Sequence, residues 1–173
     1  MIEGQICYLR AVEPTDIDIL YEWENDTTIW KDSDTRHPIN RIAIEQLAVQ
    51  ATVDVYETRQ TRLMVCNKET GIAVGCVDMF DFDPHNMHCG IGIMTESQYQ
   101  QQGYATEAIK LMCNYLFDTL GMNTIYATMR MSNHVSMHLF EKCGFNLTGV
   151  KHSWIRVGKH FEDEAFMQIN AII

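Results

Sequence analysis

The sequence lacks long apolar runs and a leader-like start. No stretch reaches the roughly eighteen consecutive apolar residues typical of a membrane-spanning helix, and the first residues do not form a basic segment followed by an apolar one. We therefore expect a soluble, cytoplasmic protein with no membrane partner. Proline is scarce and no internal repeat is visible, so the chain also lacks linkers. We expect a single domain over residues 1–173.

Basic residues are also few. The chain has 13 Lys and Arg against 23 Asp and Glu, a formal net charge of −10. This balance disfavours nonspecific nucleic-acid binding, which depends on neutralising phosphates. A cationic small molecule is a better match for the surface, although acidity for solubility alone explains the composition equally well.

Several familiar motifs are missing. The six cysteines include no CxxC pair, and we interpret them as buried thiols. Neither the GxxxxGK[ST] nor the GxGxxG spacing occurs, which argues against nucleoside-triphosphate and dinucleotide sites of those types.

The pattern of apolar residues predicts an α+β chain. The expected strands cover residues 6–12, 62–67, 73–80, 88–95, 124–129, 145–152 and 161–169. The expected helices cover residues 13–24, 39–57, 104–120 and 133–143. Strands outnumber helices in the first part of the chain, and strands then alternate with helices. This order favours a mixed, mostly antiparallel sheet of about seven strands flanked by about four helices.

A polar turn with a glycine separates a strand from the most regular helix pattern. The first backbone N–H groups of a helix have no partner within it and carry the positive end of its dipole, so they can bind an anion without a lysine. Gly103 would allow a phosphate close to the backbone. The residues of this turn are Gln100, Gln101, Gln102, Gly103, Tyr104, Ala105 and Thr106.

This turn resembles the Q-x-x-G-x-A coenzyme A loop of GNAT N-acetyltransferases, with the glutamine at Gln100. A second segment, about thirty residues later, is similar to the family's N-x-x-[AS]-x-x-L-Y-E-K-x-G-F helix. The similarity extends to the strand around Ile93 and to the N-terminal Leu9-Arg10, and it is closest to the spermidine/diamine and ribosomal-protein alanine acetyltransferase branch. The matching residues of the second segment are Asn133, Ser136, Leu139, Phe140, Glu141, Lys142, Cys143, Gly144 and Phe145.

The resemblance implies a GNAT fold and acetyl-coenzyme A as co-substrate. The backbone of Ile93, Met94 and Thr95 would pair with the pantetheine arm and polarise the thioester carbonyl. The segment from Gln100 to Thr106 would cradle the pyrophosphate. Asn133 would hydrogen-bond the pantetheine, and the helix carrying Ser136, Phe140 and Lys142 would line the cofactor's other side. The family habit also implies a homo-oligomer, a dimer or larger.

Two positions depart from the family pattern. Phe140 stands where many members have a tyrosine that protonates the leaving thiolate, and Gly90 stands where a glutamate often takes the proton of the amine. A thiol with a pKa of about 8.5 gives a thiolate that is a tolerable leaving group, so an acid is not essential. An alkyl ammonium with a pKa of about 10.4 is mostly protonated at neutral pH, so it needs a base before it can attack. The candidates are Asp81, His88 and Asp78. We favour Asp81, which is expected to end a strand and open toward the acceptor. A solvated carboxylate at a strand end, with no catalytic role, explains Asp81 equally well.

Acidic and aromatic residues near the N-terminus could bind a cationic acceptor. An ordinary amphipathic helix with a solvated face explains them equally well. With Asp81, the acceptor candidates are Glu24, Trp30, Asp32 and Asp34. No metal is expected, because the acidic and histidine-rich stretch from Asp81 to His88 is better explained as a polar loop, and the HExxH glutamate is missing between His134 and His138.

We therefore expect acetyl transfer from acetyl-coenzyme A to a primary amine, favouring a polyamine or diamine because the acceptor-side segments are acidic. Protein N-termini and antibiotics are alternative acceptors. A hypothesis from another class is a weakly catalytic acyl-coenzyme A binding module, motivated by Phe140 and Gly90.

Overall fold

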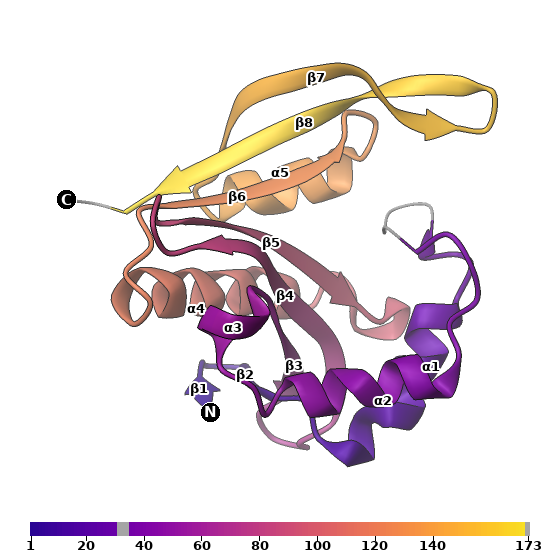
Figure 1. The fold of residues 1–173 in the computed structure, drawn as a ribbon, viewed down its shortest axis with the longest axis vertical. Coiled ribbons are helices and arrows are strands. Elements are labelled where there is room, and N and C mark those ends of the chain that lie inside the picture. The colour runs from indigo at the N-terminus through magenta and orange to yellow at the C-terminus, as the bar shows by residue number, and fades with distance from the viewer. Residues whose placement is uncertain (31–34, 172–173) are drawn as a thin grey trace.

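The computed structural model describes residues 1–30 and 35–171. Its centre is an eight-stranded sheet in the order β1-β2-β3-β4-β5-β6-β8-β7 (Figure 1). Among the described strands, only β5 and β6 run parallel, and all other neighbours are antiparallel. The strands are β1 (Ile2–Glu3), β2 (Cys7–Ala11), β3 (Thr61–Asn67), β4 (Ala73–Asp83), β5 (His88–Thr95), β6 (Thr124–Arg130), β7 (Asn146–Val157) and β8 (His160–Asn170).

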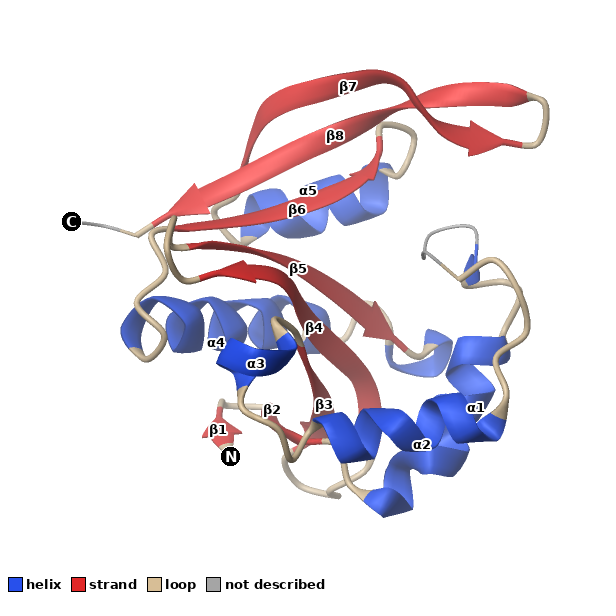
Figure 2. Cartoon of the chain, viewed as in Figure 1, coloured by secondary structure: helices blue, strands red, loops and turns tan. Residues whose placement is uncertain are grey.

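Within residues 1–30 and 35–171, five α-helices and two short 3-10 helices accompany the sheet (Figure 2). The α-helices are α1 (Ile17–Asn25), α2 (Arg41–Gln50), α3 (Val55–Thr58), α4 (Tyr104–Asp118) and α5 (His134–Lys142), and the 3-10 helices are η1 (Pro14–Asp16) and η3 (Ser97–Tyr99). In the described part of the chain, no helix combines the length and apolarity needed to cross a membrane.

Alternation along β3 and β4 sends apolar side chains to both faces of the sheet. Val65 and Val77 join the core that includes α4, whereas Met64 and Cys76 join a second core with α1 and α2. Because successive side chains of a strand point to opposite faces, α4 and the α1–α2 pair cover opposite sides. Burial on both sides explains why these strands read as nearly continuous apolar runs.

The parallel pair β5 and β6 separates partway along its length. Its registered pairs end at Gly90 and Tyr126, although β5 continues to Thr95 and β6 to Arg130. Figure 1 shows the two strands side by side at one end and apart at the other. The backbone of β5 from Ile91 onward therefore has no strand partner on its β6 side within the described sheet.

The predicted fold class is confirmed, with local differences. The two-residue strand β1 was not expected, since so short a segment has no recognisable period. The expected helix over residues 39–57 is two helices, because the carboxylate of Asp54 accepts from the backbone N–H of Tyr56 at 2.7 Å and starts α3. β4 does not stop at Phe80 but continues past an irregularity to Asp83.

Candidate active site

The opening between β5 and β6 leads into a cleft of about 1060 Å³. We call the side of the cleft where the co-substrate is expected the donor side, and the side where the amine is expected the acceptor side; different elements supply the two. The donor-side lining comprises Ile93 and Met94 of β5, Thr128, Met129 and Arg130 of β6, and Asn133, Ser136 and Phe140 at α5. Unpaired backbone N–H and C=O groups at the edge of β5 can pair with an extended amide-bearing chain, as the pantetheine arm is.

The loop between β5 and α4 has the geometry of an anion site. Gly103 precedes α4 with φ +93°, and Gln101 has φ +60°, both in the left-handed region. As a glycine at the N-cap, Gly103 offers no side-chain acceptor to the first N–H groups of α4. Those N–H groups therefore remain available to a phosphate.

Side chains of the same loop hold its shape. The amide of Gln100 donates to the carbonyl of Thr95 at 3.3 Å, and that of Gln102 donates to the carbonyl of Gln98 at 2.8 Å. Tyr104 is buried, and its hydroxyl accepts from the amide of Asn67. An anion at this loop would therefore contact mainly backbone groups, which Gly103, Ala105 and Thr106 supply.

Helix α5 brings three of its four expected residues to the cleft. Asn133 caps the helix, its side-chain oxygen accepting from the backbone N–H of Ser136 at 3.1 Å. Phe140 is only 3% exposed and packs edge-on against Phe145, with ring centroids 5.0 Å apart. Lys142 is exposed at the end of α5 and does not line the cleft.

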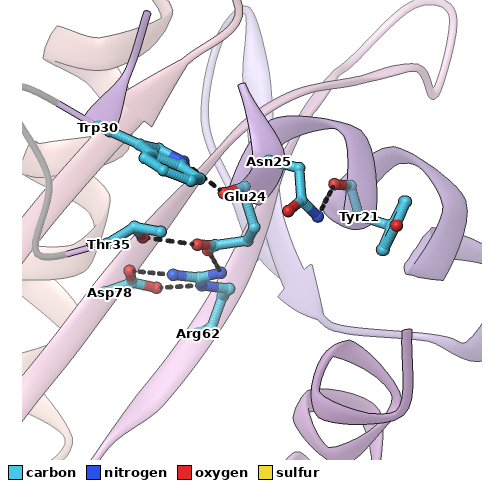
Figure 3. Close-up of polar contacts among 7 residues, drawn as sticks. All are labelled: Tyr21, Glu24, Asn25, Trp30, Thr35, Arg62 and Asp78. Atoms are coloured by element: carbon cyan, nitrogen blue, oxygen red, sulfur yellow. Dashed lines mark hydrogen bonds and ion pairs between the residues drawn. The ribbon is translucent and has the colours of Figure 1, made fainter. Parts of the chain in front are cut away.

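The acceptor side contains an ion cluster that joins α1 to the sheet (Figure 3). Arg62 on β3 donates through Nε and Nη2 to the two carboxylate oxygens of Asp78 on β4, both at 2.7 Å. Its Nη1 donates to Glu24 of α1, whose other oxygen accepts from the hydroxyl of Thr35 at 3.2 Å. Trp30 donates from its indole N–H to the backbone carbonyl of Glu24 at 2.8 Å. All five residues line the cleft.

The cluster carries one negative charge in excess, since two carboxylates share one guanidinium. Burial alone lowers the pKa of Arg62, but neighbouring anionic groups, Asp78 and Glu24 among them, hold it well above its usual value. Arg62 is not among the residues that the sequence predicted for the site. Its signal was a charge at the start of a mostly apolar expected strand, facing an aspartate across the expected hairpin.

The expected acceptor residues are only partly brought together. Glu24 and Trp30 line the cleft, whereas Asp32 and Asp34 lie outside the described residues. Asp81 does not line the cleft. It sits in the irregularity of β4 with φ +51°, and its carboxylate accepts from the hydroxyl of Tyr126 at 2.7 Å. The expectation that Asp81 ends its strand was wrong, because the left-handed residue kinks β4 and lets it continue.

His88 and Gly90 also supply no base to the cleft. His88 lies outside the cleft lining, with its Nε2 3.8 Å from Asp83. At Gly90, a Cβ atom would lie 2.3 Å from the ring of Phe80, so that ring fills the space of the family's glutamate. Among the described residues, no three or more His, Cys, Asp or Glu side chains group as metal ligands would.

The sequence model of the family described as the acetyltransferase (GNAT) domain matches residues 7–146. The chain belongs to the GNAT acetyltransferase family. As a GNAT enzyme, it is an acetyl-coenzyme A dependent N-acetyltransferase, which confirms the predicted reaction type and co-substrate.

Relatives of this GNAT chain include spermidine N(1)-acetyltransferase of Escherichia coli strain K12, 23% identical over 145 residues that cover 82% of this chain and 73% of the relative. A solved spermidine N-acetyltransferase from Vibrio cholerae, in complex with CoA and spermine, superposes with a TM-score of 0.85 at 21% identity, covering 96% of each chain. A dodecameric structure of the Vibrio cholerae enzyme gives a TM-score of 0.80 at 19% identity, covering 96% of this chain and 95% of that one. At these identities the structural similarity establishes the fold.

Proposed function

We propose that this enzyme acetylates a small primary amine, with a polyamine or diamine as the favoured acceptor. The observation that carries the proposal is the excess negative charge of the Glu24–Arg62–Asp78 cluster, which lies in the same cleft as the donor opening. An ammonium group complements that charge. The spermidine acetyltransferases among the relatives support the same class of acceptor.

On the donor side, the backbone of Ile93 and Met94 pairs with the pantetheine arm and polarises the thioester carbonyl. Thr95 extends the same strand edge. The turn from Gln100 to Thr106 binds the pyrophosphate through backbone N–H groups, and Asn133 contacts the pantetheine. Holding amine and thioester in one cleft converts a bimolecular reaction into an effectively unimolecular one. The thiolate leaves without a tyrosine, because Phe140 has no hydroxyl.

A peptide N-terminus is a second candidate acceptor. Arg130 and Arg156 line the same cleft, and guanidinium groups suit carbonyl or carboxylate oxygens better than they suit a polycation. The weakly catalytic acyl-coenzyme A binding module is a further alternative, because Phe140 and Gly90 leave the usual acid and base positions empty.

An initial-rate panel with acetyl-coenzyme A, read by thiol release, separates these candidates. The panel contains spermidine, putrescine, an alanine-initiated peptide and an aminoglycoside. We expect the highest kcat/KM with spermidine or putrescine. A preference for the peptide would replace the polyamine proposal, and tight acetyl-coenzyme A binding without acetylation of any amine would favour the binding module.

We also propose a homo-oligomer that forms through the exposed edge of the sheet. β7 is the last strand of the sheet and is mostly exposed, and Trp154 on it is 62% exposed. The dodecameric relative supports assembly into more than a monomer. Light scattering on the purified chain should give a mass of at least two copies, and a monomer at all concentrations would contradict this.

A further inference from the structure

A carboxylate on β4 faces the cleft where the central strand β5 has no side chains. Asp78 is the cross-strand partner of Gly92, and Phe80 is the partner of Gly90. Opposite residues of an antiparallel pair project from the same face of the sheet. A Cβ atom on Gly92 would meet only the Phe80 ring, at 3.9 Å, so nothing on β5 covers Asp78 from this direction.

From this arrangement we propose that Asp78 binds the ammonium of the acceptor and takes its proton, and that Arg62 is the positioning residue that orients Asp78. The proposal rests on the proposed amine acetylation and deepens it by naming the proton acceptor. It assigns to β4 the role that the family often gives to β5 at the position of Gly90.

The hydrogen bonds of the cluster leave Asp78 capacity for a ligand. An ionised carboxylate has about four lone-pair sites, and the bidentate contact with Arg62 uses one on each oxygen. The Asp78 side chain is 32% exposed, more than the 20% of Arg62, so its open side reaches the cleft. The charge of Arg62 balances that of Asp78. Glu24, which contacts the same guanidinium, therefore leaves the cluster with a net charge of one negative unit.

The reaction balances with this assignment. The ammonium transfers one proton to the Asp78 carboxylate and becomes a neutral amine. The amine nitrogen attacks the thioester carbonyl, the C–S bond breaks, and the departing thiolate takes the second proton from the nitrogen. The products are an N-acetylated amine, coenzyme A as its thiol, and a protonated Asp78 that returns its proton to water.

Asp78→Asn tests the assignment, because it keeps the size of the side chain and removes its charge. Arg62 remains paired with Glu24 in this variant, so the fold should persist, which thermal unfolding and acetyl-coenzyme A affinity would verify. We expect kcat/KM for the amine to fall about a hundredfold near neutral pH, within the usual range for loss of a general base. Asp81→Asn, a neighbouring carboxylate on the same strand, is assayed in parallel.

The pH profile separates a chemical role from a structural one. As the pH approaches the pKa of the amine, about 10.4, free amine no longer needs a proton acceptor, so the deficit of Asp78→Asn should shrink. A constant deficit at every pH, wild-type activity in Asp78→Asn, or a loss in Asp81→Asn instead would overturn the assignment. Arg62→Lys should keep the shape of the profile while lowering kcat. If the wild-type enzyme acetylates no amine, it is the proposed function that fails.

Discussion

At the scale of single residues, two glycines share a left-handed conformation but differ in their surroundings. Gly103 has φ +93° in the donor loop, and Gly121 has φ +68° beyond α4. A β-branched side chain in this region costs roughly 1–2 kcal/mol. We expect both variants to lose stability, Gly103→Val more than Gly121→Val because its Cβ would lie 3.3 Å from Ile6. Only Gly103→Val should lose acetyl-coenzyme A affinity, by at least about tenfold.

Isothermal titration and thermal unfolding of the two valine variants test this expectation. Gly121→Val is the matched control for backbone strain. Unchanged affinity in Gly103→Val would refute the position of the pyrophosphate.

Phe140 reports whether protonation of the leaving group limits the rate. Phe140→Tyr adds a hydroxyl to a ring that lines the cleft. We expect kcat to rise by up to about tenfold with little change in KM, because a general acid lowers the barrier to thiolate departure. Steady-state kinetics measure this, and an unchanged kcat would show that thiolate departure is not limiting.

Asp16 makes the stability of the N-terminal segment depend on pH. Its buried carboxylate accepts from Arg10 at 2.6 and 2.8 Å and from the backbone N–H of Glu13 at 2.8 Å. Burial raises the pKa of Asp16, but these hydrogen bonds outweigh burial and hold the pKa below its usual range. The folded pKa is therefore below the unfolded value of about 3.9, so this stabilisation is present above pH ~4 and is lost as the pH falls through the folded pKa.

Asp16→Asn should lower the free energy of unfolding by about 2 kcal/mol at neutral pH, because it removes the negative charge and one acceptor oxygen from the pair with the partly exposed Arg10. Denaturant unfolding across the acid range measures this loss. The variant should also show a weaker dependence on pH below about 4 than the wild type. An equal dependence of the unfolding free energy on pH in the variant and the wild type would show that Asp16 does not contribute to stability in acid.

At the scale of elements, two helices begin with the same cap but differ in function. Asn133 caps α5 at the cleft, and Asn40 caps α2, its side-chain oxygen accepting from the backbone N–H of Ala43 at 2.9 Å. Asn133→Ala and Asn40→Ala should each cost about 1 kcal/mol of stability. Only Asn133→Ala should weaken acetyl-coenzyme A binding, as titration would detect. Equal affinities in both variants would refute the pantetheine contact.

Sequence periodicity predicted the elements that have one buried face. The apolar spacing after Gly103 predicted α4, which buries Ala108, Ile109 and Met112. Periodicity could not place the break between α2 and α3, which depends on a single side-chain cap at Asp54. It also could not predict the kink at Asp81, because a left-handed non-glycine residue leaves no pattern in the sequence.

At the scale of the whole molecule, the residues expected on the donor side form continuous segments of the chain, whereas those on the acceptor side do not. The donor loop is one continuous segment, so its motif is legible in the chain. The acceptor cluster joins α1, β3 and β4, and its members Glu24, Arg62 and Asp78 become neighbours only in the folded sheet. The charge of Arg62 opposite Asp78 in the expected hairpin was a local signal for that pair, but no local pattern reports the long-range pairing of Arg62 with Glu24.

Amide hydrogen exchange with and without acetyl-coenzyme A shows whether the co-substrate binds between β5 and β6. We expect new protection at residues 91–95 and 103–106, because unpaired β5 amides and the first α4 amides acquire hydrogen-bond partners. The amides of β3 and β8 should change little. Protection elsewhere, with residues 91–95 and 103–106 unchanged, would place the co-substrate at another site.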